Sequence, residues 1–108
     1  MAYPQGAIVL ATDPFGNAPK RPYVVLSNST HPFHGQEYVA AVITTTERHN
    51  AIELTPERIE RGSLPRRSFV SPWSVTTLKD AVIDTQPAQV TGETVDDTRR
   101  ELNKYLEG

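Results

Sequence analysis

Arg21 and Thr44 are of residue types that suit phosphate chemistry, and each stands at the end of an expected strand. Arg21 directly precedes Pro22 and a β-branched apolar run, so its backbone is fixed at the mouth of a buried strand. Its planar guanidinium can bind a phosphate group in a bidentate manner, with two hydrogen bonds. An arginine in this place can instead be a strand-end residue paired with an acid such as Asp13 or Glu37, and the residue alone leaves both readings open.

Thr44 belongs to a run of three threonines at the end of the third expected strand. Successive side chains of a strand point to opposite faces, so Thr44 and Thr46 point one way and Thr45 the other. β-Propensity alone would also place threonines here. If the second and third strands pair antiparallel, the start of one lies beside the end of the other. Arg21 and Thr44 would then meet at the same edge of the sheet.

The three histidines are the usual candidates for proton transfer near neutral pH. His31, His34 and His49 all fall in predicted loops. His31 and His34 could form a metal-binding or proton-transfer pair, but their spacing is not helical and no acidic residue follows at ligand spacing. We interpret all three as solvated loop residues and keep the acid/base pair as an alternative.

Short segments, separated by nine prolines and six glycines, must position these residues. Runs rich in β-branched and other apolar residues, each bounded by turn residues, predict strands. The expected strands cover residues 7–12, 23–27, 38–45, 51–54, 68–70, 74–77 and 82–84. About six short antiparallel strands favour a mainly β fold, namely a small and partly open barrel.

Two helices are expected. Residues 55–62 carry a capping threonine, a proline at the first position, an acid in the first turn and a closing glycine, which predicts one or two turns. A longer helix is predicted over residues 95–106, with Thr94 as part of a capping box. The stripe of this helix that should face the sheet is Val95, Thr98, Leu102 and Leu106.

Composition and charge further restrict the number of domains and the classes of function. The chain has 108 residues, of which 37% are hydrophobic and 22% charged, so we expect one folded domain over residues 1–108. The net charge of −2 means that any nucleic-acid binding must rest on a local basic patch. The absence of cysteine excludes disulfides, Cys-ligated zinc and a thiol nucleophile. The start of the chain lacks a signal-peptide pattern and a membrane-spanning run, so a cytoplasmic location is expected.

Several strings resemble, in order and over essentially the whole chain, the MazF/PemK toxin family. They are GAIV at residues 6–9, DPFG at 13–16, KRPYVVLS at 20–27, VITT at 42–45 and VTTLKD at 75–80. The resemblance implies an SH3-like barrel with a C-terminal helix, as in CcdB- and MazF-like proteins, and a homodimer. It also implies a metal-independent endoribonuclease without cofactors that cuts single-stranded RNA at short motifs and is neutralised by an antitoxin protein.

Carried over position by position, the resemblance assigns the catalytic roles to Arg21 and Thr44, with Thr45 as the alternative hydroxyl. The 2′-hydroxyl of RNA would attack the adjacent phosphate, giving a 2′,3′-cyclic phosphate and a 5′-hydroxyl, while Arg21 neutralises the charge that develops. Loop aromatics such as Phe33, and also His34, are candidates to stack on bases. The residues expected to bind RNA are Phe15, Asn17, Lys20, Ser27, Thr45, Thr46, Arg48 and Arg66, to which Arg67 is a possible addition.

The sequence departs from the family pattern at two places. The first loop, between Gly16 and Arg21, is short and lacks the carboxylate that family members often carry. The aspartate and glutamine that follow the fifth strand in the family are replaced here by Trp73 and Ser74. Both departures bear on the RNA sequence preference and on the rate.

Two alternatives use the same barrel. A CcdB-like protein would bind DNA gyrase without catalysis, through the helix at residues 95–106, and would not need Arg21 or Thr44. Because its first loop lacks that carboxylate, the protein could also bind RNA and leave it intact.

Overall fold

An apolar run near the start of the chain is buried on both of its faces. In the computed structural model, which describes residues 2–12 and 20–108, this run forms strand β1 (Ala7–Ala11) inside one antiparallel sheet. Ala7, Val9 and Ala11 belong to one apolar cluster, whereas Ile8 belongs to another. A strand buried on both sides needs cover on each, so the sheet curls round one face and carries a second layer on the other.

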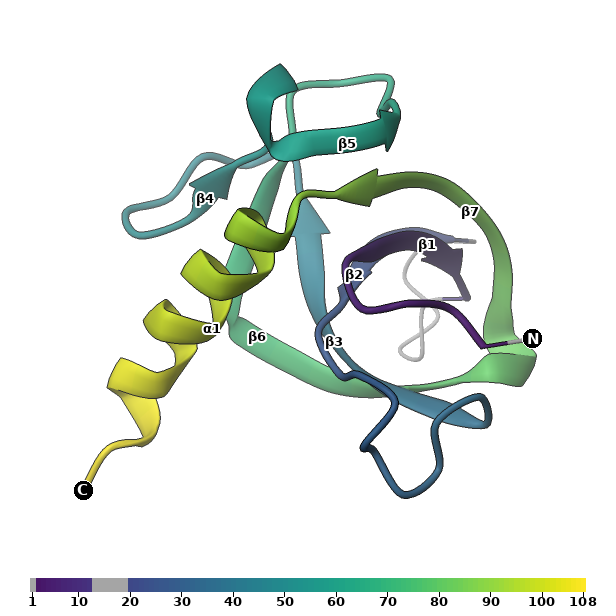
Figure 1. Ribbon diagram of the computed structural model, residues 1–108. Coiled ribbons are helices and arrows are strands. Elements are labelled where there is room, and N and C mark those ends of the chain that lie inside the picture. The colour runs from purple at the N-terminus through teal and green to yellow at the C-terminus, as the bar shows by residue number, and fades with distance from the viewer. Residues whose placement is uncertain (1, 13–19) are drawn as a thin grey trace.

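The remaining elements follow in a simple order. They are β2 (Arg21–Val25), β3 (Glu37–Thr44), β4 (Ile52–Glu53), the 3-10 turn η1 (Pro56–Arg58), β5 (Ile59–Gly62), β6 (Phe69–Lys79), the 3-10 turn η2 (Asp80–Val82), β7 (Ile83–Val90) and the helix α1 (Gly92–Leu106). The strands pair in the order β4-β6-β3-β2-β1-β7-β5. The sheet curves so that β7 arches round β1 (Figure 1). The predicted mainly β, partly open barrel with a C-terminal helix is confirmed.

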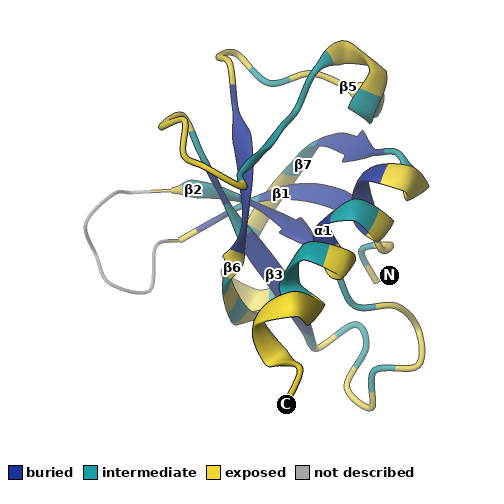
Figure 2. Cartoon of the chain, turned by 90° about the vertical axis from the view of Figure 1, so that its left-hand side faces the viewer, coloured by how far each residue is buried: buried dark blue, intermediate teal, exposed yellow. Residues whose placement is uncertain are grey.

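Helix α1 covers the outer apolar cluster. Its Val95 packs with Ile8, Val24 and Ala41 from the central strands. In Figure 2 the strands under the helix are mostly buried, while the outward face and the C-terminal end of α1 are exposed. Helix α1 thus forms an outer layer over the central strands.

The segment predicted as a short helix over residues 55–62 is mostly a strand. Its helix-start signals produce only the turn η1, after which the chain becomes β5. Ile59 pairs with Val90 of β7, and Gly62 pairs with Ala88. Pairing with β7 satisfies backbone groups of this segment, so the tertiary contact overrides the local signal.

The two strands predicted at residues 68–70 and 74–77 are one strand, β6, with a bulge. Ala41 pairs with Val75, but its neighbour Val42 pairs with Ser71, so three residues of β6 lie between consecutive rungs. Pro72, one of the three, has no N–H to offer to the ladder, which favours a bulge at this point. Strand β7 is also longer than the predicted 82–84, because it pairs with both β1 and β5.

The C-terminal helix starts earlier than predicted. Thr91, not Thr94, is the N-cap, and its hydroxyl accepts the N–H of Thr94. The predicted inward stripe holds only for the first half: Val95 and Thr98 are buried, whereas Leu106 is 71% exposed. In Figure 1 the last turn of α1 lies away from the strands, in keeping with the exposure of Leu106.

Candidate active site

The β2–β3 hairpin places Arg21 across from Thr44. Tyr23 pairs with Val42, and Val25 pairs with Ala40, in antiparallel register. Strand β2 begins at Arg21 and β3 ends at Thr44. Continuing the register by two residues sets Arg21 directly opposite Thr44. The expectation that these two residues meet at one edge of the sheet is confirmed by the register.

A groove of about 250 Å³ opens at this edge. Both residues of the pair line it, together with a second arginine and with residues of the β6 bulge. The full lining is Arg21, Val42, Thr44, Thr46, Arg48, Ser71, Trp73 and Ser74. The groove therefore draws its walls from β2, from β3 and the loop after it, and from β6.

The groove is rich in hydrogen-bond donors. It contains two guanidinium groups and four hydroxyl groups, and its lining includes no carboxylate. Among the described residues, neither Arg21 nor Arg48 has an ion-pair partner, although Lys20, Arg58 and Arg67 each do. Unpaired guanidiniums beside hydroxyls attract an anion with several acceptor oxygens, and a phosphodiester is such a group.

The hydroxyl of Thr44 is oriented by the backbone. The N–H of Thr46 donates to Thr44 Oγ1 at 3.1 Å, closing a tight turn at the end of β3. That contact occupies an acceptor site of the oxygen and leaves the O–H hydrogen free to donate. Thr44 can thus donate a hydrogen bond to a phosphate oxygen in the groove, beside Arg21.

Thr46 and Arg48 are the predicted RNA-binding residues that share this groove. Thr45 is exposed just after β3 and does not line the groove, as expected for a side chain on the opposite face. Lys20 directly precedes Arg21, but its ammonium is 2.6 Å from Asp84 Oδ2. Of the residues expected to bind RNA, the groove therefore holds Thr46 and Arg48.

Other predicted residues lie elsewhere. Ser27 follows the far end of β2, where its hydroxyl accepts the N–H of Val39 at 3.0 Å. Arg66 lines a separate groove with Leu54 and Leu64. Arg67 is bound to Glu53 at 2.8 Å, so its charge is already neutralised. Phe15 and Asn17 fall outside the described residues.

The histidine pair lies in the β2–β3 loop, at the opposite end of the hairpin from Arg21. His31 Nδ1 accepts the N–H of Phe33, and the His34 ring packs edge-on against Tyr38 at 5.8 Å. Burial, aided by Asp80, raises the pKa of Tyr38. His34 and Phe33 do not line the groove, so neither shares it with Arg21 and Thr44.

Trp73 is the largest of the lining residues that sequence reasoning did not select, and Ser71 and Ser74 are others. Trp73 was noted only as a departure from a family pattern, yet the β6 bulge turns it into the groove. The available signal was Pro72, because a proline inside a β-branched run marks a bulge or an edge.

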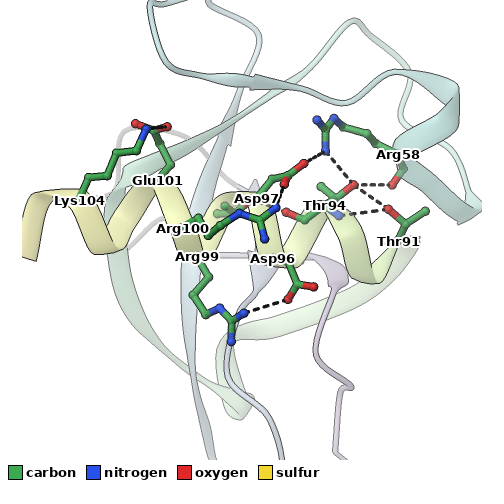
Figure 3. Close-up of polar contacts among 10 residues, drawn as sticks. Arg58, Thr91, Thr94, Asp96, Asp97, Arg99, Arg100, Glu101 and Lys104 are labelled. Carbon is green, nitrogen blue, oxygen red and sulfur yellow. Dashed lines mark hydrogen bonds and ion pairs between the residues drawn. The ribbon is translucent and has the colours of Figure 1, made fainter.

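A second arginine–hydroxyl cluster joins the end of η1, just before β5, to α1 (Figure 3). Arg58 Nη1 donates to Asp97 Oδ2 at 2.9 Å and to Thr94 Oγ1 at 3.4 Å. Arg100 also contacts Asp97. These guanidiniums, Arg58 first, hold the pKa of Asp97 below its ordinary value. Here the arginine has its acceptors within the chain, and its role is to fix the helix.

Two further findings concern the described part of the chain. Its helix is too short and too polar to cross a bilayer. No three side chains of His, Asp or Glu come close enough together within it to hold a metal ion.

By sequence, the chain matches no protein-family model and no curated protein. Its fold is nevertheless shared with solved structures. It aligns with an endoribonuclease in complex with its cognate antitoxin from a mycobacterial species at 23% identity, covering 97% of this chain and 95% of that one, with a TM-score of 0.78.

A MazE–MazF structure from Deinococcus radiodurans aligns at 17% identity, 98% and 96% coverage and a TM-score of 0.73. The Mycobacterium tuberculosis toxin MazF-mt6 aligns at 18% identity, 93% and 95% coverage and a TM-score of 0.72. At these identities the likeness establishes a common fold over nearly the full length of each chain.

Proposed function

We propose that this chain is a MazF/PemK-type toxin, a metal-independent endoribonuclease that cleaves single-stranded RNA. One observation carries the proposal: Arg21 and Thr44 face each other across two paired strands, in a groove that is lined by donors and has no carboxylate in its lining. The fold shared with an endoribonuclease supports it independently.

RNA brings its own nucleophile, so the groove need not supply one. The 2′-oxygen attacks the adjacent phosphorus, and the bond from phosphorus to the 5′-oxygen breaks. The 2′-hydroxyl loses a proton and the departing 5′-oxygen gains one, which leaves a 2′,3′-cyclic phosphate and a 5′-hydroxyl. Negative charge accumulates on the phosphoryl oxygens between these events, and stabilising that charge is the main task of the protein.

Arg21 is suited to this electrostatic task. Its guanidinium stays protonated in proteins, with a pKa above about 12, so it serves as a fixed positive charge rather than as a proton carrier. Thr44 donates its O–H to a phosphate oxygen or orients the 2′-hydroxyl. Arg48, in the same groove, binds a neighbouring phosphate and keeps the strand in place.

The same groove suits a protein inhibitor. An acidic, disordered tail of an antitoxin would place carboxylates where RNA places phosphates, and Arg21 and Arg48 would bind them in the same way. A homodimer with a two-fold axis would extend the concave surface available to the RNA strand. The antitoxin partner, the homodimer and the cytoplasmic location are all parts of the proposal that the chain is a toxin.

The test is cleavage of single-stranded RNA in EDTA by the wild type, by Arg21→Ala and by Arg61→Ala. Arg61 is an exposed arginine on β5, outside the groove, and serves as the matched control. We expect the wild type and Arg61→Ala to cut alike and Arg21→Ala to be slower by about 10²–10³. Polynucleotide kinase should label the new 5′-hydroxyl ends directly.

Intact RNA with every protein would refute the nuclease. Retention of uncut RNA in a gel shift would then favour an RNA-binding protein. Capture of gyrase that is insensitive to Arg21→Ala would favour the CcdB-like alternative, which stays a prediction until that experiment.

A further inference from the structure

Trp73 places an aromatic residue in the lining of the groove. It is the single tryptophan of the chain and is 38% exposed, although it lies in the middle of the longest strand. The bulge between the Val42–Ser71 and Ala41–Val75 rungs takes it out of the regular ladder.

No hydrogen bond, ring contact or cation–π contact of the indole occurs within the described residues. It belongs to neither apolar cluster and has no ring contact there. The cation–π contact found there is between Arg67 and Phe69, and no hydrogen bond of the Trp73 side chain occurs there. A large aromatic side chain held partly exposed, beside unpaired cations, is suited to contact a ligand.

The lining on either side of Trp73 defines the chemistry of that ligand. Arg21, Arg48 and the hydroxyl of Thr44 suit a phosphate, whereas the indole of Trp73 adds a flat apolar group to the lining of the same groove. A molecule that carries an anionic phosphate and a flat aromatic ring on one chain is a nucleotide. Single-stranded bases bind proteins mainly by stacking on such rings.

We propose that Trp73 stacks on a nucleobase next to the phosphate held by Arg21. This inference rests on the proposed nuclease and names the group that fixes the RNA strand in register over Arg21 and Thr44. Because any base has a stacking face, Trp73 supplies affinity and position for many sequences. The neighbouring Ser74, also in the lining, adds one hydroxyl that can reach a base edge.

The single tryptophan makes the contact directly observable. The probe is a short single-stranded oligonucleotide with 2′-deoxyribose throughout, which has no 2′-hydroxyl and is not cleaved. Stacking should change the Trp73 fluorescence as the probe is titrated. An oligonucleotide of equal length with abasic sugars, which keeps the phosphates, should leave the fluorescence unchanged.

Variants measure the strength of the contact by fluorescence anisotropy of a labelled probe. Trp73→Ala should weaken binding roughly 5- to 150-fold, and Trp73→Phe should retain most of the affinity. Val75→Ala is the matched control, because Val75 is similarly exposed on the same strand and does not line the groove. Circular dichroism and the Tm of each variant confirm that it is folded.

The outcomes separate this inference from the proposed function. RNA cleavage that needs Arg21, together with an unresponsive Trp73 and normal binding by Trp73→Ala, overturns the stacking contact and leaves the nuclease intact. Base-dependent quenching without RNA cleavage supports the stacking contact and refutes the nuclease. If the protein neither cleaves RNA nor shows quenching of Trp73 fluorescence, both the nuclease and the stacking contact are overturned.

Discussion

Two arginine–threonine clusters in this molecule have opposite surroundings. In the groove, Arg21 lies across from Thr44 with a second arginine nearby and no carboxylate in the lining. At the start of α1, Arg58 binds Asp97 and Thr94, and the side chains of Arg58 and Asp97 are 29% and 25% exposed.

The difference lies in the acceptors. Where the chain provides acceptors, as for Arg58, the guanidinium holds two elements together. Where it provides hydroxyls but no carboxylate, as around Arg21, an anionic acceptor must come from outside, and a phosphate supplies several oxygens. The comparison teaches that the neighbours of an arginine, rather than its exposure, distinguish a binding arginine from a structural one.

The largest expected effect is on catalysis by the groove. Arg21→Ala should lower the cleavage rate by about 10²–10³, because one stabilising donor is removed from the developing charge. Its unfolding free energy should stay within about 0.5 kcal/mol of the wild type, because the Arg21 side chain has no ion pair or hydrogen bond to lose within the described residues. Single-turnover cleavage and urea unfolding measure the two quantities. A large loss of stability would place Arg21 in the structural class with Arg58.

The hydroxyl opposite Arg21 should matter somewhat less. Thr44→Val removes a hydrogen bond to a charged group, which is worth about 1.5–3 kcal/mol, so cleavage should slow by roughly 10- to 150-fold. Thr44→Ser keeps the hydroxyl and should keep most of the rate. Thr45→Val, on the opposite face, is the companion variant in the same cleavage assay. If Thr45→Val were the slower enzyme, Thr45 rather than Thr44 would be the catalytic hydroxyl.

The structural cluster should show the reverse pattern. Arg58→Ala leaves the Asp97 carboxylate short of a partner and removes a contact between η1 and α1, so we expect a loss of about 1–2 kcal/mol in unfolding free energy. Cleavage at temperatures well below the Tm should be unchanged. Arg99→Ala, which breaks an exposed ion pair with Asp96, should cost less than about 0.5 kcal/mol. Equal losses in both variants would contradict the role given to Arg58.

The same cluster should be sensitive to acid. The pKa of Asp97 is lowered in the folded chain, chiefly by Arg58, from an ordinary value of 3.8. A lowered pKa gives stability that is present above the ordinary value and is lost as the pH falls through the folded one. The stability gap between the wild type and Asp97→Asn should therefore narrow as the pH falls below about 4. Urea unfolding between pH 7 and pH 3 measures it, and a gap that is constant with pH would refute the ion pair.

Sequence was sufficient for the parts of this molecule that depend on neighbouring segments. Arg21 and Thr44 could be brought together from the sequence because β2 and β3 are consecutive strands, and a hairpin fixes which ends meet. The buried run of β1 and the C-terminal helix are likewise visible as local patterns.

The parts that sequence missed depend on distant partners. Residues 59–62 form a strand because β7 lies beside them, although their local signals favour a helix. Trp73 enters the groove because of a bulge in the pairing of β6 with β3. Such pairing brings together residues some thirty positions apart. Pro72 marks a bulge or an edge locally, but it does not say which strand lies opposite.

The smallest expected effect comes from a cation placed between the two classes. Lys20 adjoins Arg21, yet its ammonium is paired with Asp84, and both side chains are about half exposed, at 48% and 50%. An exposed pair is worth less than about 1 kcal/mol, so Asp84→Asn should hardly change the stability. It should release Lys20 toward the groove and strengthen binding of an uncleavable oligonucleotide by less than about 5-fold at low salt, since the pair contributes so little. The gain should vanish at high salt, where exposed charges are screened, and in the double variant with Lys20→Gln. A gain that persisted in the double variant would mean that Asp84 repels the phosphates directly, and Lys20 would then belong to neither class.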